Sequence, residues 1–147
     1  MASLRELLGS GDKRNQVIDD SLRVVDLEVD DKSGLSGIAI KTAYRLVKGV
    51  SPAFLRQAVD HLLDPFLDAL DPMYQEAVGK GIPPRQHLQA NPDRAADALL
   101  GITDARAQNS KNQMVKATYE KLRGQAKKHV VAAVPRLGEL FERHVNG

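Results

Sequence analysis

The sequence predicts an all-α protein, a single helical domain over residues 1–147. Apolar residues recur at helical spacing, as in Leu55, Val59 and Leu62 at i, i+4 and i+7, which places them on one helix face. No segment has the sustained two-residue alternation, bounded by hairpin turns, that is typical of half-buried strands. A chain of 147 residues is also long enough to bury a core without a disulfide or a structural metal.

An internal repeat with an offset of 75 residues runs through the chain. Lys, Tyr and Gly recur in register, as Lys41, Tyr44 and Gly49 in the first copy and Lys116, Tyr119 and Gly124 in the second. The same offset aligns the apolar residues of 55–70 with those of 130–145. The repeat predicts two pseudo-equivalent three-helix units, about 14–70 and 92–145, joined by a connector over 71–91.

We expect three helices in each unit and a short helix at the N-terminus. The spans are about 14–31, 37–49 and 52–70 in the first unit and about 92–107, 111–124 and 126–145 in the second. The N-terminal helix starts at a capping box of Ser3 and Glu6. Residues 24–29 could also form a strand, but a helix is favoured because their counterparts at 99–102 follow a run of good helix formers.

Prolines and capping residues set the expected boundaries. Four prolines follow good N-cap residues, at Ser51-Pro52, Asp64-Pro65, Asp71-Pro72 and Asn91-Pro92. Because the residue before proline avoids the helical region and proline suits the first helical position, each pair predicts a helix start. Ser36, and a capping box of Ser110 with Gln113, are expected to start the two Lys-Tyr helices. Pro135 should kink the last helix or mark its restart.

Two further expectations concern the packing of the units and their connector. The apolar face of helix 52–70 should pack against that of helix 126–145, because units this small gain stability from a shared core. In the connector, Gly79 and Gly81 around Lys80 are expected to let the chain reverse. This segment lacks the glycine spacing and the Ser or Thr of a phosphate-binding loop.

The residue types exclude several classes of function. The chain has no Cys, which excludes a disulfide framework, thiol catalysis and cysteine-rich metal sites. The four His residues show no ligand spacing, and no nucleophile elbow or dinucleotide glycine cluster is present. We therefore expect no catalytic residues and no cofactor, with an enzyme that uses an unrecognised site as an alternative. We expect no signal peptide and no membrane span, which favours a cytoplasmic location.

Basic residues gather toward the C-terminus and suggest an anion-binding surface. Residues 108–147 carry eight Lys and Arg against three acids, although the whole chain has a net charge of only +2. The candidate anion-binding residues are Lys41, Arg45, Lys48, Lys116, Arg123, Lys127 and Lys128. If the two Lys-Tyr helices lay side by side, they would form one bipartite surface. In the alternative, each Tyr ring is core with a bonded hydroxyl, and the Lys residues stay in water.

An acidic row is the best candidate for a metal site. Its members are Asp60, Asp64, Asp68 and Asp71, which can share a helix face, and carboxylates in such a row could hold a hard divalent cation. Asp64 and Asp71 each precede proline, however, and helix capping explains them more simply. We therefore predict no metal. The basic C-terminal third could instead pack beside this acidic row.

These observations favour a non-enzymatic interaction module that binds a protein partner or self-associates. The alternative is weak, sequence-nonspecific binding of nucleic acid or another polyanion through the basic C-terminal third. It is less favoured because the chain has no Trp and only 4% aromatic residues, which leaves few rings for base stacking. A helix-turn-helix over 92–124 is conceivable, but its second helix would place Lys116, Glu120 and Arg123 where a base reader needs Arg, Asn or Gln, which argues against it.

Four segments carry a resemblance to a known family. They are Lys41-Thr42-Ala43-Tyr44 with Val47-Lys48-Gly49, Phe66 to Pro72, Ala96 to Gly101, and Lys121 to Val130. With them, nearly the whole chain resembles a small bacterial family of unknown function and similar length. The resemblance implies an all-helical cytosolic protein and supplies no activity, cofactor or catalytic residue.

Overall fold

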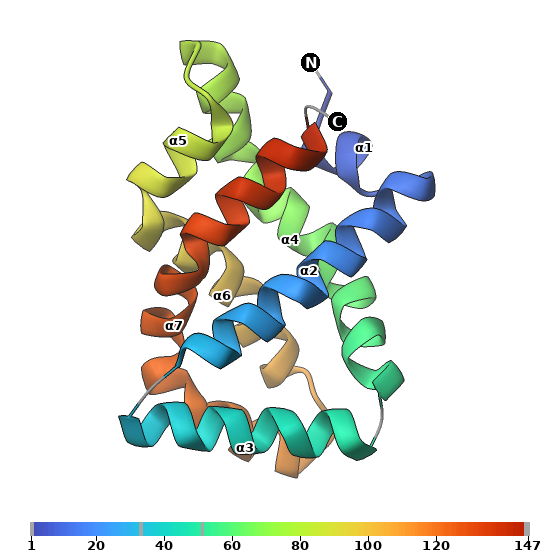
Figure 1. The fold of residues 1–147 in the computed structure, drawn as a ribbon, viewed down its shortest axis with the longest axis vertical. Helices are drawn as coiled ribbons and strands as arrows, with labels where there is room; N and C mark the ends of the chain where they lie inside the picture. The colour runs from blue at the N-terminus through green and yellow to red at the C-terminus, as the bar shows by residue number, and fades with distance from the viewer. Residues whose placement is uncertain (1, 33, 51, 146–147) are drawn as a thin grey trace.

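The computed structural model describes residues 2–32, 34–50 and 52–145, apart from the side chains of residues 35, 36, 47, 50, 52 and 115. Over these residues the chain forms helices and no strand, so the predicted all-α class is confirmed (Figure 1). The helices are α1 (Leu4–Leu8), α2 (Gly11–Asp31), α3 (Gly34–Val50), α4 (Pro52–Lys80), α5 (Pro84–Ala90), α6 (Pro92–Gln108) and α7 (Gln113–Val145). The segment 24–29 lies inside α2 and is helical, as expected.

The two longest helices do not pack directly on each other. Both α4 and α7 contact α2 and α6, but within the described ranges no Cα atoms of α4 and α7 approach within 8 Å. Figure 1 shows α2, α4, α6 and α7 arranged around the centre of the molecule, with α3 crossing one end. The predicted direct packing of 52–70 against 126–145 is therefore wrong, because α2 and α6 hold the two helices apart.

The predicted helix starts at Pro65 and Pro72 are wrong, since α4 continues through both prolines for 29 residues. Pro65 has no N–H, so the carbonyl of His61 loses its helical donor. The Arg106 side chain of α6 donates to that carbonyl at 3.0 Å. A donor from a neighbouring helix thus replaces the missing bond, and the helix passes through the proline without a break.

The predicted break between residues 124 and 126 is also wrong, because α7 is one helix of 33 residues that includes Pro135. Gly124 has open space around its Cα and no positive φ. It therefore does not end the helix as a left-handed C-terminal glycine would. Gln89 of α5 donates to the Pro135 carbonyl at 3.0 Å. The second unit accordingly has two helices, α6 and α7, where three were predicted.

The capping predictions have mixed outcomes. Ser3 caps α1 by accepting the Glu6 N–H at 3.1 Å, as expected. At the start of α7 the capping role belongs to Asn112, whose side chain accepts the Met114 N–H at 2.9 Å. Ser110 accepts the Asn112 N–H instead, so the predicted box of Ser110 with Gln113 is wrong. Ser36 lies inside α3, which begins at Gly34, so the predicted helix start at Ser36 is wrong. Ser51 lies outside the described residues.

The connector is more helical than predicted. α4 runs on to Lys80, and the chain then reverses at Gly81, whose φ of 69° is the left-handed conformation that glycine adopts without strain. α5 occupies residues 84–90, and α6 begins at Pro92 as expected. None of the helices in the described part of the chain is long and apolar enough to span a lipid bilayer.

Candidate functional site

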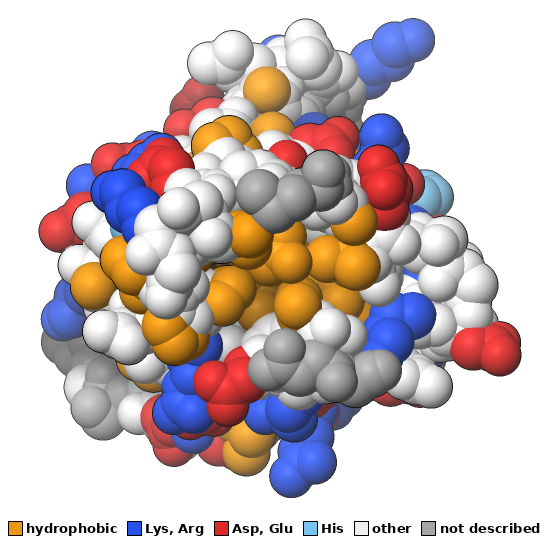
Figure 2. All heavy atoms as spheres, turned by 90° about the horizontal axis from the view of Figure 1, so that it is seen from above, with side chains coloured by type: hydrophobic (Ala, Val, Ile, Leu, Met, Phe, Trp, Pro, Cys, Tyr) orange, Lys and Arg blue, Asp and Glu red, His pale blue; other side chains and the backbone are white. Residues whose placement is uncertain are grey.

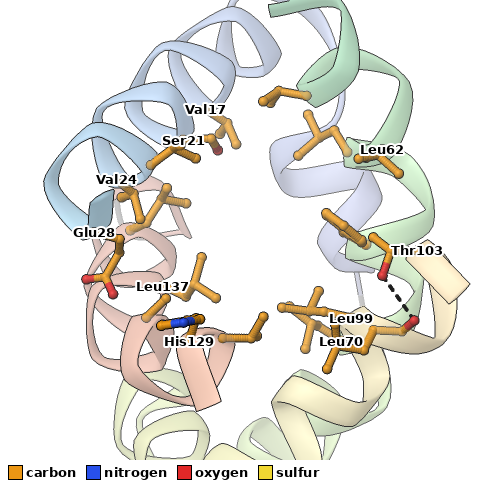
Figure 3. A pocket seen from close by; sticks show the side chains of 18 of the residues that line it. Val17, Ser21, Val24, Glu28, Leu62, Leu70, Leu99, Thr103, His129 and Leu137 are labelled. Atoms are coloured by element: carbon orange, nitrogen blue, oxygen red, sulfur yellow. Dashed lines mark hydrogen bonds between the residues drawn. The ribbon is translucent and has the colours of Figure 1, made fainter. Parts of the chain in front are cut away.

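A large apolar cavity lies between α2, α4, α6 and α7. Its volume is about 450 Å³, and Ile40 of α3 also contributes to its wall. Figure 3 shows side chains from these four helices around it, including Val24, Leu62, Leu99 and Leu137. The cavity therefore fills the space that separates α4 from α7.

The helical spacing of apolar residues explains why the walls are apolar. On α4 and α7, residues one and two turns apart face the cavity: Leu62, Phe66 and Leu70 on α4, and Val130, Ala133 and Leu137 on α7. The same helices supply fully buried residues such as Leu67 and Leu140 to the surrounding core. Small side chains such as Ala133 do not reach across the gap that α2 and α6 impose.

Few polar side chains line the cavity, and most of them have partners. Thr103 donates to the Leu100 carbonyl at 3.1 Å (Figure 3) and lies 2.8 Å from the hydroxyl of Tyr119. Glu28 and Lys32 form an ion pair at 3.4 Å, and their side chains are only 12% and 11% exposed. Glu28 also binds Arg136 of α7.

His129 differs from these residues, because its Nε2 atom is buried and has no hydrogen-bond partner among the described residues. Figure 3 shows the imidazole at the cavity wall. Burial lowers the pKa of His129 from its ordinary value of 6.5, and the positive charges of Lys32 and Lys128 lower it further. The ring is therefore neutral at neutral pH, with one nitrogen unsatisfied beside an apolar cavity.

Hydrophobic side chains are also accessible from outside. Figure 2 shows a hollow at one end of the molecule, with hydrophobic side chains on its floor and charged side chains on its rim. Large exposed hydrophobic residues include Ile38 and Leu46 of α3 and Phe54 at the start of α4. Exposed hydrophobic side chains thus lie on α3 and at the start of α4.

Three of the candidate anion-binding residues are neutralised by aspartates. Lys48 binds Asp26 at 3.0 Å, Arg123 binds Asp104 at 2.7 Å, and Lys127 binds Asp97 at 3.1 Å. Hydrogen bonds from Arg123 and then Tyr119 hold the pKa of Asp104 below its ordinary range.

The remaining candidates are Lys41, Arg45, Lys116 and Lys128. Lys116 lines a polar pocket of about 480 Å³ together with Arg123, Asp104 and Glu120. Lys41 and Arg45 lie on α3, and no Cα atoms of α3 and α7 come within 8 Å in the described part of the chain. The two Lys-Tyr helices are therefore not side by side, so Lys41 and Lys116 do not form the bipartite anion-binding surface that such an arrangement would give.

The acidic row binds arginines from the N-terminal helices. Arg14 contacts Asp60 at 3.0 Å and Asp64 at 2.8 Å, and Arg5 contacts Asp64 and Asp68. Burial alone would raise the pKa of Asp64, but the bonds from Arg14 and Arg5 outweigh it and lower the pKa.

The row also holds α1 in place, and in the described part of the chain its ion-pair partners are arginines of α1 and α2 rather than residues of the basic C-terminal third. Asp71 accepts the Leu4 N–H at 2.9 Å. The C-terminal arginines bind acids of α2 instead: Arg136 binds Glu28 and Asp31, and Arg143 binds Asp20. Among the described residues, no three His, Asp or Glu side chains are grouped as a metal site would require.

Sequence reasoning did not find the cavity or His129. The cavity exists because α2 and α6 hold α4 and α7 apart, and the spacing of apolar residues along a sequence does not encode the distance between helices. One signal was present, because His129 directly precedes the longest uninterrupted apolar run, 130–134. Because these apolar residues are expected to pack in the core, a histidine directly before them is expected to lie next to apolar side chains.

Comparison with known proteins shows a family and no characterised relative. No curated protein and no solved structure matches the chain. One family model matches residues 4–145, and its description is "Family of unknown function (DUF6918)". Since the match covers almost the entire sequence, the chain belongs to this family.

Proposed function

We propose that this protein is a non-enzymatic binding protein that holds an apolar small molecule in the cavity between α2, α4, α6 and α7. The observation that carries the proposal is the cavity itself, with a volume of about 450 Å³ and almost entirely aliphatic and aromatic walls. Ligand sites in proteins are typically concave, mostly apolar and roughly 300–1,000 Å³ in volume.

The apolar lining of the cavity supports an occupant. The cavity is partly open to solvent, so without a ligand its aliphatic and aromatic walls stay in contact with water. Such walls offer water few hydrogen-bond partners. A ligand that covers them with hydrocarbon would gain roughly 25 cal/mol for each Å² of apolar surface removed from water.

Titration with N-phenyl-1-naphthylamine, a neutral apolar fluorophore, tests the proposal. We expect its fluorescence to rise and saturate at one probe per chain. Ala133→Leu adds three carbon atoms to the cavity wall and should weaken probe binding, with no loss of melting temperature because the added atoms enter unfilled space. The matched control is Ala132→Leu on the adjacent, exposed residue of the same helix, which should bind the probe like the parent protein.

Two results would overturn the proposal. One is the absence of saturable binding in the parent protein, and the other is equal binding by the Ala133 and Ala132 variants. Sedimentation at the same concentrations separates the proposal from self-association. A dimer that Ala133→Leu dissociates would mean that a second copy of the chain occupies the cavity, as an oligomeric interaction module would require.

Anion binding is a second and separate proposal. It is supported by the polar pocket that contains Lys116 and Arg123, although Asp104 and Glu120 in the same pocket offset their charge. Charge reversal as Lys116→Glu should reduce retention on heparin, and Lys41→Glu on α3 tests the other copy. Unchanged retention in both variants would remove the proposal. A cytoplasmic location is likewise proposed, and cell fractionation would test it.

A further inference from the structure

We infer that the molecule bound in the cavity is a long-chain carboxylate whose head group lies against His129 and Lys32. This inference rests on the proposed function, because it names the chemical class of the ligand for the same cavity. Its basis is the distribution of polar atoms along the cavity wall.

His129 supplies a hydrogen-bonding atom that nothing in the described protein uses. Its Nε2 atom is buried without a partner, and leaving such an atom unsatisfied costs roughly 1–3 kcal/mol. Burial keeps the ring neutral, so Nε2 carries either a proton to donate or a lone pair to accept one. A carboxylate oxygen would accept the Nε2–H bond of the corresponding tautomer.

The charges around His129 favour a negative head group. The two charges that act on the imidazole are both positive, those of Lys32 and Lys128. The Lys32 side chain is only 11% exposed and lines the cavity. Its partner Glu28 is shared with Arg136, and Figure 3 shows the Glu28 carboxylate turned away from the cavity. Arg136 also binds Asp31, so a carboxylate beside Lys32 would share this cation with Glu28 and would approach it from the cavity side.

Apart from Ser21 and Thr103, the remaining walls are apolar and fit a hydrocarbon chain. Thr103 already donates to Leu100 and lies within bonding distance of Tyr119. From His129 the lining continues through aliphatic residues such as Leu137 and Leu70. A ligand with one polar end and an unbranched apolar tail matches this pattern, because burying further polar groups against aliphatic walls would be costly.

Calorimetric titration with tetradecanoate and with tetradecanol at about pH 8, where a carboxylic acid is fully ionised, tests the inference. The two probes have the same chain and differ in the head group. We expect the parent protein to bind tetradecanoate about tenfold or more tightly than the alcohol. His129→Leu and Lys32→Met should each remove most of that preference. They should change the affinity for the alcohol by less than about threefold.

Two controls make the outcome specific. Lys80→Met removes the same charge from the exposed end of α4 and should leave both affinities unchanged. In histidine-labelled protein, tetradecanoate should shift the ¹⁵N resonance of His129 Nε2 and raise the pKa of the ring, because an adjacent carboxylate favours the imidazolium form. Tetradecanol should not raise that pKa.

The failures of the inference and of the proposed function can be told apart. If N-phenyl-1-naphthylamine and tetradecanol bind but tetradecanoate has no advantage, the inference is wrong and the cavity remains a binding site. Equal losses for acid and alcohol in His129→Leu would also overturn it, since they would show a packing defect. If none of the three probes binds, the proposed function itself fails.

Discussion

Tyr44 and Tyr119, which occupy matching positions of the internal repeat, each donate their hydroxyl to an aspartate on the preceding helix. The acceptors are Asp26 on α2 and Asp104 on α6. A cation one turn after each tyrosine, Lys48 or Arg123, binds the same carboxylate. The aspartates lie 18 and 15 residues before their tyrosines, a difference of about one helical turn. The two copies of the repeat thus make the same Tyr-Asp contact, but the two aspartates are not at equivalent positions of the repeat.

The first prediction is that each tyrosine is energetically coupled to its own aspartate. Tyr119→Phe should lower the free energy of unfolding by about 1–2 kcal/mol, because it removes a hydrogen bond to a charged acceptor. A double-mutant cycle of Tyr119→Phe with Asp104→Asn, measured by urea unfolding, should give a coupling energy of roughly 0.5 kcal/mol or more. The control cycle pairs Tyr44→Phe with Asp104→Asn and should be additive. Additivity in both cycles would contradict the prediction.

The second prediction concerns the proline within α4. Arg106→Met should destabilise the protein by about 1 kcal/mol, because the His61 carbonyl loses the donor that replaces the missing Pro65 N–H. In a Pro65→Ala background the same substitution should cost less, since alanine supplies a backbone N–H that can bond that carbonyl within the helix. Thermal unfolding of the four variants measures the difference. An equal cost in both backgrounds would show that Arg106 stabilises α6 by another route.

The sequence was sufficient for the fold class and for much of the helix pattern, because both depend on local information. The helical period of the apolar residues and the cap at Ser3 are readable from a few neighbouring residues, and both were predicted correctly. The boundaries at Pro65 and Pro72 failed for a tertiary reason. Whether a proline ends a helix depends on whether a residue distant in sequence, here Arg106, satisfies the carbonyl that the proline leaves free.

The candidate site was harder to predict because it depends on what the helices leave unfilled. Charge runs directed attention to Lys48, Arg123 and Lys127, yet each of these has an aspartate partner on another helix. Those aspartates lie in parts of the sequence that no local pattern connects to them. A shared functional role for Lys41 and Lys116 therefore stays a prediction. The second copy of the repeat does not form the predicted three helices, because α7 is one continuous helix.

The third prediction concerns acid stability. Burial would raise the pKa of Asp20, but the bonds from Arg143 and His144 outweigh it, so the pKa lies below its ordinary value of 3.8. A group whose pKa is lowered by folding contributes stability above its unfolded pKa, and this contribution is lost as the pH falls through the folded pKa. Asp20→Asn should therefore lower stability at about pH 7 and flatten its decline below about pH 4.

Urea unfolding across this pH range checks the prediction. The matched control is Asp30→Asn on the same helix, at an exposed position, which should change neither the stability near neutrality nor its decline in acid by a comparable amount. The interpretation of Asp20 as an ion-paired anchor between α2 and α7 would be refuted by an Asn variant as stable as the parent protein at neutral pH.

The fourth prediction is that His129 lowers the stability of the empty protein. His129→Leu removes a buried nitrogen without a partner and should raise the free energy of unfolding by about 1 kcal/mol at about pH 7. The ring's pKa is lowered by burial and by Lys32 and Lys128, so below about pH 6.5 the unfolded chain takes up the proton first. Stability should fall as the pH drops through this window, and His129→Leu should remove that part of the slope.

The control for this prediction is His61→Leu, which changes an exposed histidine of α4 and should neither stabilise the protein nor alter the slope by the same amount. A destabilised His129→Leu variant would mean that the imidazole contributes favourable packing to the empty protein. The expected result, a more stable variant with a weaker preference for the carboxylate, would show that His129 is costly for folding and useful for binding. Such a trade-off is typical of residues selected for function, because polar groups that await a ligand reduce the stability of the unliganded state.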